Sequence, residues 1–161
     1  MRLAADTGAL LSLACSRHSR MVFDEHTFLI TDSVLQELES FAHYNDFLGM
    51  KAKELSKRKF RVKKPRTRIA LGLALAETEV FMLAKEEKLL ALTDDVHAAR
   101  VAYERLRLRT RLSFYLLFLL YKKGRIKKED LTIDLQSILR YRNWLGGALW
   151  EYVLHLMEQL E

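Results

Sequence analysis

Residues 76–95 read AETEVFMLAKEEKLLALTDD and combine a helix pattern, a strand pattern and a pair of acids. Apolar residues recur at helical spacing over residues 68–88, whereas Leu89 to Leu92 is a continuous apolar run typical of a buried strand. Asp94 and Asp95 stand where that strand should end. Charged carboxylates at such a place are costly unless they hold a cation or do chemistry, so this stretch predicts an acidic site at the end of a strand.

The same order of strand, acid and helix opens the chain. Leu3-Ala4-Ala5 is a short apolar run that ends at Asp6. Thr7 can then serve as the N-cap of a helix over residues 8–17. Asp6 and Asp94 therefore each follow a strand, and in a parallel sheet both would lie at the carboxyl edge, where ligands bind.

The rest of the chain continues this alternation. A strand over 28–30 precedes a helix over 33–43, which Ser33 and Gln36 would open as a capping box. Further elements are predicted as a helix over 45–59, a short basic strand over 60–62, the helix over 68–88, the strand over 89–92, a helix over 95–106, a strand over 106–110 and a helix over 112–123, with Gly124 just beyond its end. Together they predict a three-layer α/β/α fold with a mainly parallel central sheet.

Residues 1–125 are predicted to form this domain, and residues 126–161 a helical C-terminal extension. Its helices are expected over 134–142 and 145–160, with a break at Gly146-Gly147. The apolar face of the second helix can pack on the same domain or on a partner. Tyr141 and Trp144 could likewise mark a homodimer contact or a groove for a partner protein.

Composition sets limits on the class of protein. At 161 residues, half of them hydrophobic, the chain has the size of one globular domain. Cys15 is its single cysteine, so no internal disulfide can form, and no signal-peptide pattern opens the sequence. The longest apolar run, Phe114 to Tyr121, is far shorter than the roughly 20 residues of a membrane-spanning helix. We therefore expect a cytoplasmic protein without a membrane span.

Basic charge is concentrated in residues 51–68, which hold ten of the 27 Lys and Arg residues and one acid. Such a local excess is expected of a phosphate-binding surface, although charge runs are often only solvated surface. Phe60, within this segment, can stack on a nucleic-acid base or pack in the core. We call residues 57–68 the basic arm; its cations are Lys57, Arg58, Lys59, Arg61, Lys63, Lys64, Arg66 and Arg68.

Two helices contribute further candidate acids. In the helix over 33–43, Glu37 lies at the margin of the apolar stripe, where it can border a cleft or simply face solvent. In the helix over 68–88, Glu77 falls inside the apolar arc and Glu79 outside it, so helical geometry favours Glu77.

Four converging acids would repel one another unless a cation lay among them. Mg²⁺ or Mn²⁺ is the natural occupant, because both prefer carboxylate and water oxygens. Asp95 is either a further ligand or the N-cap of the helix that follows it. The histidines and the cysteine show no zinc-binding spacing.

Four short pieces, in this order along the chain, resemble a PIN domain, a family of metal-dependent ribonucleases. They are ADTGALL at 5–11, VLQEL at 34–38, AETEVFMLA at 76–84 and LTDD at 92–95. The resemblance implies a parallel sheet flanked by helices and hydrolysis of RNA phosphodiester bonds with Mg²⁺ or Mn²⁺. It implies catalytic and metal-binding roles for Asp6, Glu37, Glu77 and Asp94, a further metal-binding acid at Asp95, supporting roles for Thr7 and Thr93, and phosphate contacts from the basic arm.

Several functions are compatible with these features. A metal-dependent endoribonuclease can be the toxin of a toxin-antitoxin pair, with an antitoxin as partner, or it can mature a cellular RNA. A PIN module without catalytic activity would only bind RNA or act as a scaffold. A receiver or nucleotide-binding domain also clusters acids around Mg²⁺, but the chain has no glycine-rich phosphate loop.

Overall fold

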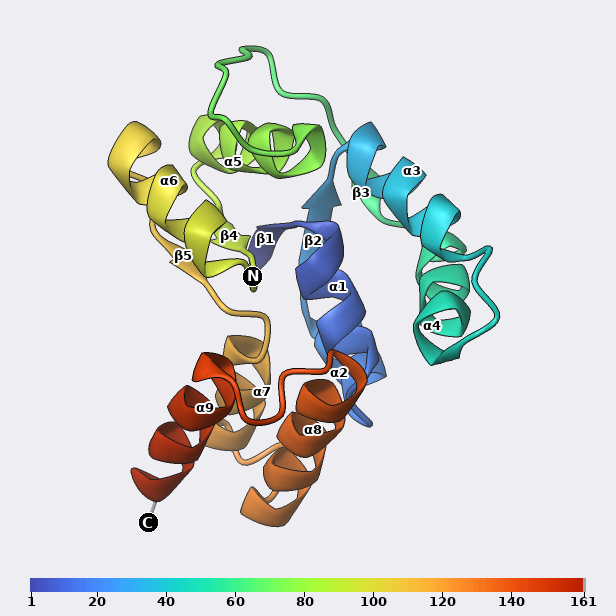
Figure 1. The fold of residues 1–161 in the computed structure, drawn as a ribbon, viewed down its shortest axis with the longest axis vertical. Coiled ribbons are helices and arrows are strands. Elements are labelled where there is room, and N and C mark those ends of the chain that lie inside the picture. The colour runs from blue at the N-terminus through green and yellow to red at the C-terminus, as the bar shows by residue number, and fades with distance from the viewer. Residues whose placement is uncertain (161) are drawn as a thin grey trace.

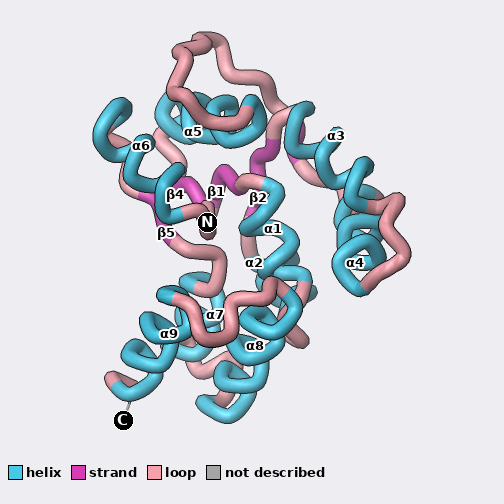
Figure 2. Tube along the Cα trace, viewed as in Figure 1, coloured by secondary structure: helices cyan, strands magenta, loops and turns pink. Residues whose placement is uncertain are grey.

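Short strands lie at the centre of residues 1–160, the part of the chain that the computed structural model describes, and helices surround them (Figure 1). Figure 2 shows how small the strand content is beside the helices. The elements are, in chain order, β1 (Arg2–Ala5), α1 (Thr7–Ala14), α2 (Ser19–Glu25), β2 (Thr27–Ile30), α3 (Asp32–Phe41), α4 (Phe47–Ser56), β3 (Arg61–Val62), α5 (Leu75–Glu87), β4 (Leu90–Leu92), α6 (Val96–Leu106), β5 (Thr110–Arg111), α7 (Tyr115–Lys122), α8 (Lys128–Tyr141) and α9 (Ala148–Glu158).

The strands form one parallel sheet in the order β3-β2-β1-β4-β5. The central strand is β1, in which Leu3 pairs with Phe28 of β2 on one side and with Leu90 of β4 on the other. The chain first extends the sheet from β1 through β2 to β3, and then continues on the opposite side with β4 and β5. The crevice between β1 and β4 is therefore the topological switch point, at which sheets of this kind bind ligands.

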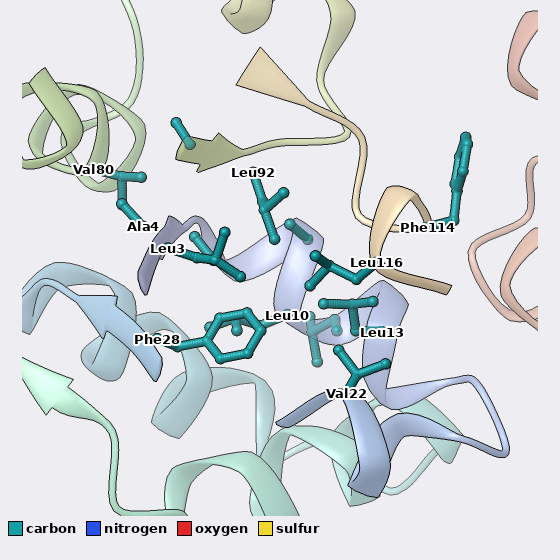
Figure 3. Packing of buried hydrophobic residues seen from close by; sticks show 14 of the residues in the cluster. Leu3, Ala4, Leu10, Leu13, Val22, Phe28, Val80, Leu92, Phe114 and Leu116 are labelled. Carbon is teal, nitrogen blue, oxygen red and sulfur yellow. The ribbon is translucent and has the colours of Figure 1, made fainter. Parts of the chain in front are cut away.

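Helices cover both faces of the sheet. On one face, α5 contacts β1 and β4, and α6 contacts β5; on the other, α2 contacts β2 and also α7 (Figure 1). In the buried core, Leu10 and Leu13 of α1 lie near Leu116 of α7, whereas Val80 of α5 approaches Ala4 of β1 (Figure 3). The predicted three-layer α/β/α fold with a mainly parallel sheet is confirmed.

Several predicted boundaries differ from the structure. The helix over 8–17 ends at Ala14, where the Ser16 hydroxyl donates to the carbonyl of Leu13 (2.8 Å), and α2, which the sequence pattern did not predict, follows. The helix over 68–88 begins only at Leu75, because residues 66–68 are bonded to acids of α5 and run alongside it. The last strand begins at Thr110, because α6 continues to Leu106 and ends in a left-handed turn.

Two predicted helix caps are replaced by neighbouring residues. Asp6, not Thr7, caps α1 by accepting a hydrogen bond from the backbone N–H of Ala9 (2.7 Å). Thr31, not Ser33, caps α3 through the N–H of Val34. Both shifts free a hydroxyl for tertiary contacts, since Thr7 and Ser33 instead bond to glutamates of other helices.

The C-terminal helices pack on the first 125 residues. α8, which begins six residues earlier than predicted, contacts α1 and α7, and α9 packs against α8. Asp134 of α8 is fully buried; it accepts a hydrogen bond from the backbone N–H of Arg17 (2.7 Å) and pairs with His18 Nδ1 (2.8 Å). This carboxylate joins α8 to the turn between α1 and α2. None of the helices in residues 1–160 has both the length and the apolar content that crossing a bilayer requires.

Replacing Asp134 with Ala should lower the free energy of unfolding by about 2–3 kcal/mol, because the Arg17 N–H and His18 lose a buried partner. Chemical denaturation followed by circular dichroism measures the change. Glu129→Ala is the matched control, since Glu129 is an exposed acid on the same helix, and it should cost less than about 1 kcal/mol. Equal losses in both variants would contradict a docking role for Asp134.

Candidate functional site

The carboxyl ends of β1 and β4 bring Asp6 and Asp94 to the switch point of the sheet. The backbone N–H of Asp6 donates to the carbonyl of Leu92 (3.2 Å), which extends the pairing of the two strands by one residue. The chain turns into a helix directly after Asp6 and shortly after Asp94, so both side chains leave the sheet at its edge. Both side chains border the crevice.

A cleft with a cavity of about 330 Å³ opens at this edge. We call it the acidic cleft. It collects all five acids singled out in the sequence, from two strand ends and from α3, α5 and the start of α6. The lining residues are Asp6, Thr7, Gly8, Glu37, Ala74, Ala76, Glu77, Asp94, Asp95, Arg142 and Trp144.

Asp6 is an acid whose negative charge the protein disfavours. Its side chain is 5% exposed, and burial raises its pKa from 3.8 to about 7. Hydrogen bonds from Thr93 and from the Ala9 N–H lower this pKa, whereas the charges of Asp94 and Glu77 raise it. The protein alone therefore leaves negative charge in the cleft poorly compensated, which favours a bound cation.

Asp94 is similarly buried, at 7% exposure, and burial raises its pKa. One carboxylate oxygen, Oδ1, accepts a hydrogen bond from the backbone N–H of Ser113 (2.7 Å). The other, Oδ2, is buried and has no hydrogen-bond partner in residues 1–160. The Ser12 and Ser113 hydroxyls and the charge of Arg142 lower the pKa of Asp94 but do not offset burial. Oδ2 is therefore the oxygen of Asp94 that remains open to a further donor or a cation.

The two glutamates of the acidic cleft are half-buried. Glu37 accepts a short hydrogen bond from the Thr7 hydroxyl, which fixes the end of its long side chain beside Asp6. Glu77 accepts from the backbone N–H of Ala74 (3.2 Å) at the start of α5. Burial raises the pKa of Glu77, with the neighbouring charge of Asp95 as the next cause.

Asp95 and Thr93 have local structural contacts. Asp95 is exposed and caps α6 by accepting from the N–H of Ala98 (2.8 Å). The Thr93 hydroxyl accepts from the Asp95 N–H (3.2 Å), and its hydrogen bond to Asp6 stabilises the ionised form of that acid. Of the two roles that the sequence allowed for Asp95, the structure shows the helix cap. Its carboxylate also lines the cleft.

Helical geometry predicted that Glu77 lies on the buried face of its helix and Glu79 outside it, and the structure shows the reverse order of burial. Its side chain is buried at 4% exposure, whereas Glu77 is only half-buried. Glu79 accepts from Ser33 Oγ (2.6 Å) and pairs with Arg68 Nη2 (2.9 Å). The loop before α5 folds over this face of the helix, which periodicity within the helix cannot reveal. Glu79 is therefore the glutamate with a basic partner, and Glu77 lines the acidic cleft.

The basic arm is held along α5 by acids of that helix. Lys63 pairs with Glu87 (2.5 Å), the backbone N–H groups of Arg66 and Thr67 donate to Glu86, and Arg68 pairs with Glu79. Arg58 pairs with Asp24 and lies over the ring of Phe23. Some of the arm's cations are therefore structural. Five exposed cations form no ion pair in the described part of the chain: Lys57, Lys59, Arg61, Lys64 and Arg66.

Phe60 packs in the core rather than facing solvent. Its ring lies 6.0 Å from that of Phe23 and 6.3 Å from that of Phe28, in edge-to-face geometry. Of the two interpretations that the sequence allowed for Phe60, the structure supports core packing.

Arg142 and Trp144 line the acidic cleft although the sequence did not single them out as site residues. Both lie in the turn between α8 and α9, far along the chain from every predicted ligand. The signal available in the sequence was a cation and an aromatic residue within five residues of the Gly146-Gly147 pair, but nothing in the sequence indicates that this turn reaches the edge of the sheet.

The donors of the acidic cleft fit a hard divalent cation. No three His, Cys, Asp or Glu side chains within residues 1–160 converge closely enough to enclose an ion. Mg²⁺, however, keeps several waters and takes only one or two carboxylates. Carboxylate oxygens, with no His or Cys donor in the lining, and the unpartnered Oδ2 of Asp94 suit such an open, partly hydrated site.

The fold and the cleft define an α/β protein with an acidic site at the switch point of a parallel sheet. A family model described as DUF3368, PIN domain, matches residues 2–159, so the chain belongs to the PIN-domain family and the resemblance seen in its sequence is confirmed. A PilT N-terminus domain protein from the hyperthermophilic archaeon Sulfolobus solfataricus has a similar structure, with a TM-score of 0.53 and 16% sequence identity over 74% of this chain and 92% of that one. No curated protein matches the chain.

Without a divalent cation, Asp6 should make stability depend on pH. Its folded pKa of about 7 exceeds the unfolded value, so the folded state binds this proton more tightly and loses stability by a few kcal/mol as pH rises from about 4 to about 7. In EDTA, Asp6→Asn should therefore melt at least about 4 °C above wild type near pH 8, and the difference should vanish near pH 4.

Thermal melts over this pH range test the expectation, and adding Mn²⁺ near pH 8 should stabilise wild type more than Asp6→Asn. Asn keeps the capping oxygen of α1, so loss of the cap does not complicate the comparison. Glu39→Gln removes an exposed charge from α3 and should melt like wild type throughout. A difference between Asp6→Asn and wild type that does not change with pH would contradict the raised pKa.

Proposed function

We propose that this PIN-domain protein is a Mg²⁺- or Mn²⁺-dependent endoribonuclease. PIN domains are in general nucleases. The observation that carries the proposal is the convergence of Asp6, Glu37, Glu77 and Asp94 on one cleft at the switch point, with the buried Oδ2 of Asp94 lacking a partner. Asp6 and Asp94 would hold the cation, with Glu77 and Asp95 as further oxygen donors, directly or through water.

When bound, the cation would polarise the phosphate and favour ionisation of a water molecule. Glu37, oriented by the Thr7 hydroxyl, would accept a hydrogen bond from the attacking water and align it with the phosphorus. Thr93 would keep Asp6 ionised and oriented through its hydrogen bond. Hydrolysis joins the water oxygen to phosphorus and releases the departing ribose oxygen, which takes up a proton.

Cleavage of single-stranded RNA with Mn²⁺ tests this function, and EDTA should abolish it. Asp94→Asn and Glu37→Gln should each lower the rate by at least about 100-fold, because each removes a group that acts at the reacting phosphate. Glu39→Gln, two residues from Glu37 on the same helix, is the matched control and should leave the rate unchanged. Wild type that binds RNA but does not cleave it with any divalent cation would instead indicate a PIN module that only binds RNA.

The unpaired cations of the basic arm would hold the RNA backbone without reading its sequence. Lys59→Gln combined with Lys64→Gln should weaken RNA binding and reduce the slope of log affinity against log salt concentration by about 1.4, or about 0.7 for each phosphate that the arm no longer neutralises. Fluorescence anisotropy over a salt series measures the slope. The double variant Lys85→Gln with Lys88→Gln removes equal charge at the C-terminal end of α5 and should keep the wild-type slope. Equal slopes in both double variants would show that the basic arm is only solvated surface and does not contact RNA phosphates.

The resemblance also suggests a biological role as the toxin of a toxin-antitoxin pair, with an antitoxin and a second copy of the chain as partners. The alternative is a cytoplasmic enzyme that matures cellular RNA. Induced expression separates them, because a toxin arrests growth unless its antitoxin is co-expressed, and a maturation enzyme does not.

A further inference from the structure

Arg142 brings a positive charge into the acidic cleft from the end of α8. It is the C-cap residue of that helix, and its Nη2 lies 3.5 Å from where a Cβ on Gly8 would stand, a point equally close to Asp6 Oδ1. Its Nε is buried and has no hydrogen-bond partner within the described residues. The guanidinium thus lies among carboxylates without forming an ion pair with any of them in residues 1–160.

Trp144 holds this guanidinium from the other side. The Arg142 Cζ lies 5.2 Å from the centroid of the Trp144 ring, within cation–π range. The backbone N–H of Trp144 donates to the carbonyl of Leu139 (2.8 Å), and Asn143 between them adopts a left-handed conformation (φ 56°). The turn therefore directs both side chains into the cleft, and the indole remains partly accessible there.

The Nη atoms of the guanidinium are not buried as Nε is and form no ion pair within residues 1–160, so they are the donors that call for an acceptor from the cleft. The carboxylates of the cleft do not supply it. A phosphate diester offers two oxygens that match the planar fork of donors on an arginine. An RNA strand that enters a cleft lined by carboxylates also needs fixed positive charge to offset repulsion of its backbone.

We propose that Arg142 and Trp144 form a substrate-positioning wall of the acidic cleft, in which Arg142 binds an RNA phosphate and Trp144 stacks on an unpaired base. This inference rests on the proposed ribonuclease function and adds two residues that would position its substrate. Stacking on the indole requires a base that has left its helix, so single-stranded RNA is the expected substrate.

RNA binding measured in EDTA tests the phosphate contact independently of cleavage. Arg142→Ala should weaken binding of a single-stranded oligonucleotide by about tenfold and lower the salt slope by about 0.7. Arg142→Lys should keep the slope but recover only part of the affinity, because a lysine cannot form the fork. Arg140→Ala removes the same charge from an exposed position on the same helix and should change neither quantity. Identical salt slopes for wild type and Arg142→Ala would overturn the phosphate contact.

Fluorescence tests the stacking contact. The chain has two tryptophans, so Trp150→Phe leaves Trp144 as the only one. Single-stranded RNA should quench its emission, duplex RNA should not, and Arg142→Ala should reduce the quenching at a given RNA concentration. Binding of single-stranded RNA without quenching would overturn the stacking contact.

These outcomes are separate from failure of the proposed function. If wild type does not cleave RNA but Arg142→Ala still lowers its affinity and salt slope, the wall binds RNA in a protein that is not a nuclease. If wild type cleaves RNA and Arg142→Ala binds RNA as wild type does, the ribonuclease stands and the wall is refuted. Mn²⁺ binding to Arg142→Ala, followed by electron paramagnetic resonance, should tighten by about tenfold, because one positive charge near the cation is lost; a gain of about a thousandfold or more would make Arg142 chiefly an internal counter-charge and overturn the positioning role.

Discussion

The pairing of β1 with β4 is the contact on which the site depends. These strands come from different parts of the chain, and their register places Ala5 beside Leu92. Asp6 and the segment that leads to Asp94 then leave the sheet at the same edge and at the point where strand order reverses. The two buried acids can meet only because this parallel pairing is formed by a crossover through several helices. Any change that shifts the register moves both carboxylates.

Charge is distributed unequally between the cleft and the helix beside it. On α5, Glu79, Glu86 and Glu87 accept hydrogen bonds or ion pairs from the loop that precedes the helix, so their negative charge is used to position that loop. Glu77, in the first turn of the same helix, receives only a backbone hydrogen bond. The basic arm thus neutralises acids of α5 outside the cleft and none of the acids within it, where Arg142 is the cation in the lining, so much of that negative potential stays available for a bound cation.

The sequence predicted those parts of the site that local pattern determines. Asp6 and Asp94 were predictable because each follows a short apolar strand in an alternating α/β pattern, and strand ends in such folds share an edge. The burial of Glu79 was not, because it results from a loop folding over the helix. Arg142 was out of reach for a related reason: its position depends on how α8 docks, and side-chain patterns within a helix carry little information about which turn of a distant element it will approach.

The turn between the two C-terminal helices lines the acidic cleft, so the extension contributes side chains to the edge of the sheet. The family model spans these helices, running to residue 159. Asp134 fixes α8 on the turn after α1, and α8 ends at the residue whose guanidinium lies beside the start of α1. The contact made by Asp134 and the guanidinium of Arg142 therefore both lie next to α1, the helix that Asp6 caps. Because one rigid helix carries both the docking carboxylate and Arg142, loosening the dock would withdraw positive charge from the cleft, so tail stability and the electrostatics of the site are coupled.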